Sequence, residues 1–220
     1  MNILQGILLP LTAWLIVLIS SIGMVSIISI LIKQTIILAI LIQFLYLILS
    51  YLVAKYILKA SLEIFAYKTC SLSAIINSSI ISITISIVIA YTEYNLIDPR
   101  ILKPPISNLF NNPILYIPLA FIISPIGEET LFRGLLLGSM IKMKVNRKIA
   151  IILSAILFSA IHIIPYINAN PIQIITVIFT AFILSILAGT YRVTINSIIP
   201  AIIIHACFNM GGFLITLIAL

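Results

Sequence analysis

Long runs of apolar residues, separated by short polar or basic segments, are the main pattern along the chain. A helix needs roughly 20 apolar residues to cross the hydrocarbon core of a bilayer. We count seven stretches of about this length: 8–32, 35–54, 71–91, 113–141, 149–165, 171–190 and 195–219. The pattern predicts an all-α fold, a polytopic transmembrane helical bundle of about seven spans. An eighth, re-entrant segment stays open as an alternative, because Gly211 and Gly212 could break the last stretch.

The composition indicates that these helices lie in lipid rather than in a soluble core. Of the 220 residues, 63% are hydrophobic and only 8% are charged, whereas soluble domains carry about 25% charged residues. A soluble fold of this size could not bury so much apolar surface in one core. We therefore expect a single integral membrane domain over residues 1–220, a multi-pass protein of the cell membrane.

The net charge of +7 does not indicate a nucleic-acid partner, because the cations lie in short loops and not on one basic face. Seven spans place alternate loops on opposite sides. The loops of one side carry most of the cations: Lys55, Lys59, Lys68, Lys142, Lys144, Arg147, Lys148 and Arg192. The positive-inside rule places this side and the N-terminus in the cytoplasm. Residues 92–112 then form the main external loop.

Two expectations concern the ends of the chain. The first positive charge is Lys33, so no basic segment precedes the first apolar stretch, and we expect no cleaved signal peptide. The last four residues contain no cysteine, so the chain is not expected to be a prenylation substrate itself. A short apolar chain without a soluble domain suggests a prokaryotic source.

Ionisable groups inside apolar spans are costly, and they are candidates for function. In this chain they gather in three spans, in the patterns Glu-Glu-x-x-x-Arg, Phe-x-x-x-His and His-x-x-x-Asn. The residues are Glu128, Glu129 and Arg133 in the fourth stretch, Phe158 and His162 in the fifth, and His205 and Asn209 in the last. The two histidines are the only ones in the chain.

Helical geometry separates the roles of these residues. Glu129 and Arg133 are four positions apart and share a helix face, so they are expected to form an ion pair that supports the site. Glu128 points roughly 140° away from Arg133, which leaves its carboxylate free for other work. His205 and Asn209 are also four positions apart and share a face.

Depth in the membrane brings the polar residues together. At about 1.5 Å per residue, Glu128, His162 and His205 lie roughly 15–20 Å from the expected cytoplasmic surface. Pro125 and Gly127, just upstream of the glutamates, are expected to loosen the helix and to free backbone groups near this level. The three spans therefore predict one buried polar site.

The chemistry available to such a site is hydrolysis. A carboxylate beside an imidazole can hold and deprotonate a water molecule. A second imidazole with an amide can donate hydrogen bonds to a developing oxyanion. A glutamate with two histidines could also hold zinc, but the H-E-x-x-H spacing is absent. We interpret Phe158 as a packing residue and expect Cys207 to face away from the site.

The three patterns, in this order on separate spans, resemble the signature of the CPBP family, also called Abi, of CAAX proteases and bacteriocin-processing proteins. The best-known members are the CAAX prenyl endopeptidases. The resemblance covers roughly residues 107–215, the expected catalytic core, and leaves residues 1–105 as packing spans. It implies water activation by Glu128 and His162, and an oxyanion hole formed by His205 and Asn209. It also implies no metal and no cofactor.

The leading interpretation is an intramembrane endopeptidase of the glutamic type that acts on a peptide or a lipidated, CAAX-like peptide. One alternative is a bacteriocin self-immunity or membrane scaffold protein that keeps the polar site without turnover. Another is a transporter or proton relay. The lack of charged residues inside the other expected spans argues against a continuous relay.

Overall fold

The structure is a computed structural model that describes residues 3–98, 101 and 113–219. This part of the chain folds into helices and contains no strand. Seven helical stretches in it are long and apolar enough to cross a membrane. The predicted fold class and the predicted number of spans are therefore confirmed.

The first three spans differ from the predicted ranges mainly at their ends. They are α1 (Ile3–Ile28), α2 (Thr35–Leu52), which continues into a π-helical turn at Val53–Ile57, and α3 (Leu72–Leu96). Helix α3 begins where the Ser71 hydroxyl accepts a hydrogen bond from the Ala74 amide. It extends beyond the predicted end, so residues 92–96 are helical rather than part of an external loop. Most of the rest of that predicted loop lies outside the described residues.

The fourth span changes its helical register along its length. It comprises α4 (Pro113–Pro118), a π-helical segment (Leu119–Ile123), α5 (Ser124–Glu129), a second π-helical segment (Thr130–Leu137) and α6 (Gly138–Lys142). In the first π-helical segment, the Ser124 amide donates to the Leu119 carbonyl, five residues back. Such turns are rare and occur often at functional sites. The glutamates lie between the two π-helical segments.

The last three spans are α7 (Arg147–Ile161), α8 (Pro171–Ile195) and α9 (Ile199–Ala219). Asparagine side chains cap two of them. Asn146 accepts from the Lys148 amide at the start of α7, and Asn170 accepts from the Ile172 amide at the start of α8. A short 3-10 turn, Ile164–Tyr166, lies in the connection between α7 and α8.

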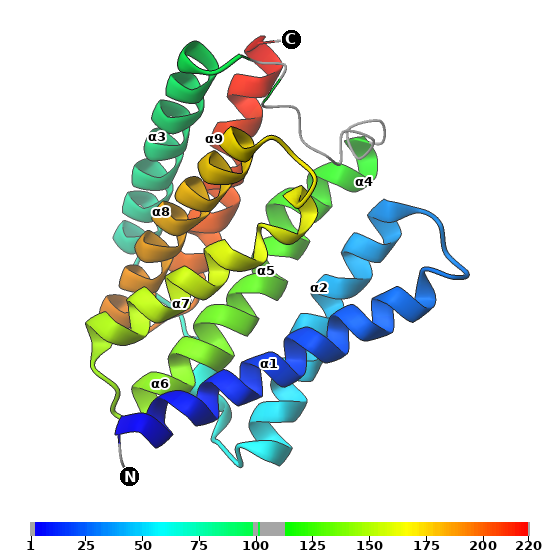
Figure 1. The fold of residues 1–220 in the computed structure, drawn as a ribbon. Helices are drawn as coiled ribbons and strands as arrows, with labels where there is room; N and C mark the ends of the chain where they lie inside the picture. Colours follow the sequence, from blue (N-terminus) through cyan, green and yellow to red (C-terminus); the bar gives the residue numbers. More distant parts are fainter. Residues whose placement is uncertain (1–2, 99–100, 102–112, 220) are drawn as a thin grey trace.

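The fourth span lies at the centre of the bundle and packs against most of the others (Figure 1). Helices α1 and α2 contact it on one side, and α7, α8 and α9 contact it on another. Helix α3 packs along α9, away from α1 and α2. The central position of the fourth span allows side chains from both groups of helices to reach its glutamates.

The two glycines of α9 pack against α3 and do not break the helix. Helix α9 is continuous through Gly211 and Gly212. A side chain at Gly211 would place its Cβ 2.7 Å from the Ser86 Cβ, and the Ser86 hydroxyl donates to the Phe208 carbonyl. Small residues allow such close approach between membrane helices. The alternative of a re-entrant segment at these glycines is therefore wrong.

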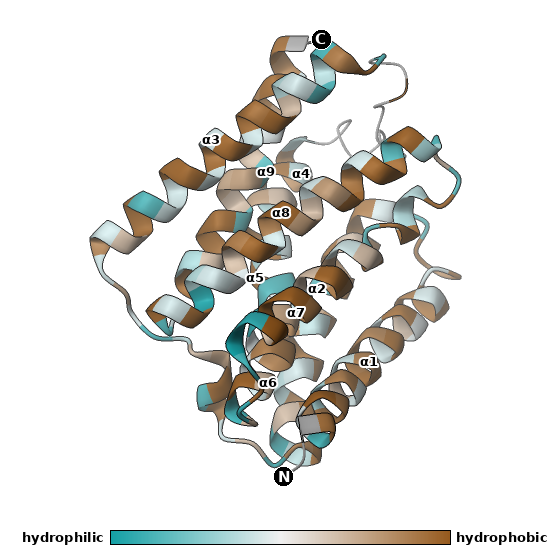
Figure 2. Ribbon diagram, turned by 60° about the vertical axis from the view of Figure 1, so that its left-hand side comes forward, coloured by the Kyte–Doolittle hydropathy of each residue, from teal (hydrophilic) through white to brown (hydrophobic). Residues whose placement is uncertain are grey.

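The described segments that connect the spans lie at two opposite ends of the bundle (Figure 1). The N-terminus, the segment after α2 and the α6–α7 connection share one end of the bundle, and the ends of α3 and α9 share the other (Figure 1). Hydrophilic residues gather near the α6–α7 connection, and apolar residues cover most of the helices (Figure 2). Arg192 departs from the prediction of a loop cation. It is buried in the last turn of α8, where it donates to the Ile64 carbonyl at 2.7 Å.

Candidate functional site

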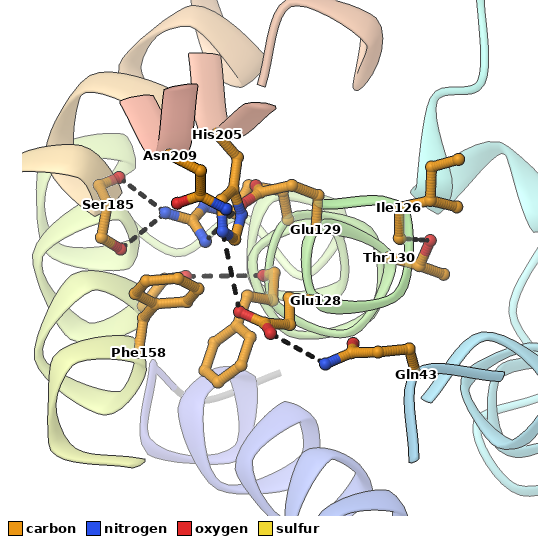
Figure 3. A network of polar contacts seen from close by, with 12 residues as sticks. Gln43, Ile126, Glu128, Glu129, Thr130, Phe158, Ser185, His205 and Asn209 are labelled. Carbon is orange, nitrogen blue, oxygen red and sulfur yellow. Dashed lines mark hydrogen bonds and ion pairs between the residues drawn. The ribbon is translucent and has the colours of Figure 1, made fainter. Parts of the chain in front are cut away.

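Glu128 is held by a side chain from α2. The Gln43 amide nitrogen donates to Oε1 of Glu128 at 2.9 Å. Gly127 makes this contact possible, because a Cβ there would lie 2.6 Å from the Gln43 side-chain oxygen. The second carboxylate oxygen, Oε2, is buried and has no hydrogen-bond partner among the described residues. Oε1 of Glu128 is thus fixed by Gln43, and Oε2 is left able to accept a hydrogen bond or a proton (Figure 3).

Glu129 is the centre of a fully buried network. Its Oε1 lies 3.2 Å from an Arg133 nitrogen, which confirms the ion pair predicted from the four-residue spacing. The same oxygen lies 2.9 Å from Nδ1 of His205. Arg133 also donates to the hydroxyl of Ser185 at 2.6 Å and to its backbone carbonyl at 3.0 Å (Figure 3). Glu129 therefore orients His205 as well as neutralising Arg133.

His205 lies between the two glutamates. A carboxylate can only accept, so the 2.9 Å contact with Glu129 requires a proton on Nδ1 of His205. The other ring nitrogen, Nε2, faces Oε2 of Glu128 at 3.9 Å. In its imidazolium form, His205 has a proton to donate on each nitrogen, and the two carboxylates, the guanidinium of Arg133 and the imidazolium carry no net charge together. The imidazole nitrogen that faces Glu128 at 3.9 Å belongs to His205, whereas the sequence interpretation paired Glu128 with His162.

His162 follows the last residue of α7. Its Nδ1 lies 2.7 Å from the Phe158 carbonyl, which can only accept, so Nδ1 carries the proton of the neutral ring. This tautomer leaves Nε2 of His162 as a proton acceptor. The buried Phe158 ring contacts both imidazoles, with its centre 4.6 Å from the centre of the His162 ring and 5.7 Å from that of the His205 ring. Phe158 therefore packs against both histidines, in agreement with its predicted packing role.

Asn209 reaches a carbonyl that the irregular fourth span leaves free. The Ser124 amide donates to Leu119 in the π register, and Pro125 has no amide proton, so the Ala120 carbonyl loses its usual helical donors. The Asn209 amide nitrogen donates to this carbonyl at 2.8 Å. The sequence prediction that this segment frees backbone groups is thus confirmed, and the second amide proton of Asn209 stays available.

A cavity of about 190 Å³ brings these groups together. Phe158, His162, His205 and Asn209 line it. Glu128 is not among the described residues that line the cavity. Its Oε2 lies 3.9 Å from His205, which does line it. Within the same residues, no three His, Cys, Asp or Glu side chains are grouped as a metal site.

Sequence reasoning missed two residues that hold the site. Gln43 was assigned to spans with no role beyond packing, although it is the only amide side chain inside the second apolar stretch. An isolated polar residue in an apolar span is a usable signal. Ser185 carried no comparable signal, because serines are abundant in this chain and many bond to their own helix.

The fold and the site define a multi-pass helical membrane protein with a buried carboxylate and imidazole cluster beside a cavity. Residues 110–211 match the model of one protein family, described as type II CAAX prenyl endopeptidase Rce1-like. This segment contains all three motifs and is therefore similar to the Rce1-like group of the CPBP family, the resemblance that the motifs predicted. Comparisons with curated proteins and with solved structures gave no match. The family supports CAAX-type endopeptidase activity in general terms.

Proposed function

We propose that the protein is an intramembrane endopeptidase in which a glutamate and the histidines activate water for attack on a peptide bond. The observation that carries this proposal is the arrangement of Glu128. One of its oxygens is fixed by Gln43, and the other, without a partner, faces an imidazole nitrogen 3.9 Å away. Such an oxygen can accept a proton from a bound water.

The two imidazoles take different parts in this proposal. His162 lines the cavity, and its neutral tautomer leaves Nε2 as a second acceptor for the water. His205 is set up as a donor, because a carboxylate lies beside each of its nitrogens. With a proton on Nε2, His205 and the free amide proton of Asn209 can donate to the carbonyl oxygen as negative charge develops there.

In the proposed reaction, water attacks the peptide bond directly and no covalent bond forms between the protein and the substrate. Water adds to the carbonyl carbon, its proton passes to Glu128, and the resulting oxyanion accepts hydrogen bonds from His205 and Asn209. The carbon–nitrogen bond then breaks, and the leaving amine takes up the proton. No metal is required by these steps, since the carboxylate supplies the base and the two donors stabilise the charge.

The expected substrate is a peptide or a lipidated peptide with a CAAX-like end, in keeping with the family. The substrate can be found by comparing the membrane proteomes of a wild-type strain and a Glu128→Gln strain. Peptides that extend past the cleavage site should accumulate in the variant strain. If both strains contain the same peptides and the variant still confers a wild-type phenotype, the alternative of a non-catalytic immunity or scaffold protein is correct.

A further inference from the structure

A third intramembrane carboxylate lines the same cavity. Glu93 lies in the last turn of α3, and its Oε1 accepts a hydrogen bond from the Thr180 hydroxyl of α8 at 3.0 Å. Its side chain is half-buried. Glu93 lies outside residues 110–211, so the family match assigns it no role. The expectation that no charged residue lies inside the spans without a motif is therefore wrong for α3, because the helix extends past the predicted end at residue 91.

Glu93 has no cationic partner among the described residues. The ion pairs found there join other groups, and the cavity lining contains neither lysine nor arginine. A partly desolvated carboxylate is stabilised by a positive charge more than by any neutral group. The C-terminal end of α3 adds partial negative charge at the same place. Both features favour a cationic ligand at this end of the cavity.

The spacing of two residues on α8 indicates how far Glu93 lies along the helix from the Glu129–Arg133 ion pair. Thr180 binds Glu93, and Ser185, five residues further along α8, binds Arg133, the ion-pair partner of Glu129. Five residues of helix rise by about 7.5 Å. An extended peptide covers about 3.3–3.6 Å per residue, so this distance corresponds to about two residues of bound substrate. Apolar side chains of α8, including Ala181 and Leu184, line the cavity between the two levels.

We propose that Glu93 forms a specificity subsite for a basic side chain of the substrate, two to three residues from the bond that is cut. The Thr180 hydroxyl fixes the carboxylate, and the lysine or arginine of the substrate forms an ion pair with it. Glu93 takes no part in proton transfer. This proposal rests on the proposed endopeptidase function, and it narrows the substrate class to peptides with a cation close to the cleavage site.

The test uses quenched-fluorescence farnesylated CAAX peptides that differ at one position. Lysine or the uncharged isostere norleucine is placed at each position within three residues of the cleaved bond, except at the farnesylated cysteine itself. At one of these positions, the purified wild-type protein should show a kcat/KM about tenfold higher for lysine, the usual size of one charged hydrogen bond. Glu93→Gln should reduce this preference to less than twofold. Glu93→Lys should reverse it in favour of a peptide with glutamate at that position.

A matched control is the exposed Glu63, which lies outside the cavity. Glu63→Gln should keep the wild-type preference for lysine. The same labelled peptides are also bound to Glu128→Gln and to the double variant Glu128→Gln/Glu93→Gln, and fluorescence anisotropy reports the affinities without turnover. If the wild-type protein cleaves no peptide, the proposed function fails, yet a tenfold binding preference that disappears in the double variant still supports the subsite. The subsite is refuted if wild type and Glu93→Gln share the same preference, or if lysine is favoured at no position in cleavage or in binding.

Discussion

The hydrogen bond from Gln43 to Glu128 gives a prediction that links the N-terminal half of the chain to catalysis. Gln43→Leu removes the one side-chain donor that Oε1 of Glu128 has among the described residues, and it changes the size of the side chain little. Hydrogen bonds to charged groups contribute about 1.5–3 kcal/mol. The bond is 2.9 Å long and Gln43 is 7% exposed, so solvent cannot readily replace the donor. We expect kcat/KM to fall about 10- to 100-fold.

The effect should lie in kcat, because Gln43 positions the base and does not line the cavity among the described residues. The assay is steady-state cleavage of a quenched-fluorescence farnesylated CAAX peptide by protein in detergent, with thermal unfolding measured on the same samples. Ser50→Ala is the matched control, since Ser50 is a buried polar residue two turns further along α2. It should keep activity within about twofold of wild type. A folded Gln43→Leu with unchanged kcat, or with only a raised KM, would refute the positioning role.

Three further predictions concern stability, metal dependence and topology. Glu129→Gln should lower thermal stability strongly, by about 3–5 kcal/mol in the free energy of unfolding, because it removes the ion-pair partner of the buried Arg133; unchanged melting in detergent would contradict this. EDTA and phenanthroline should leave peptide cleavage unchanged, and activity that is lost on chelation and restored by zinc would revive a metalloprotease interpretation. A cysteine at Lys144 should be protected from an impermeant thiol reagent in intact cells and one at Lys103 should be labelled; the opposite pattern would reverse the orientation.

Features set by local sequence were predictable. The seven spans follow from apolar length alone, and the Glu129–Arg133 pair follows from a four-residue spacing on one helix. The freed carbonyl of the fourth span was also foreseeable, because a proline removes a backbone donor wherever the helix lies. These predictions needed no knowledge of which helices are neighbours.

Features set by packing between helices were not predictable. The sequence gives no sign that Gln43 approaches Glu128, because the contact joins residues 85 positions apart. His205 was expected to work with Asn209, yet its position between two glutamates depends on how α9 meets α5. Gly211 and Gly212 were misread as a possible break, since a glycine in a span also serves where another helix approaches closely.

The most direct test of the central claim compares wild type with Glu128→Gln in cleavage and in binding of one farnesylated CAAX peptide. If Glu128 activates the water, the variant should show no cleavage above the uncatalysed rate in single-turnover experiments. It should still bind the peptide with an affinity within a few-fold of wild type, because the Glu128 side chain does not line the cavity described here. Cleavage by Glu128→Gln at a rate near that of wild type would contradict the account.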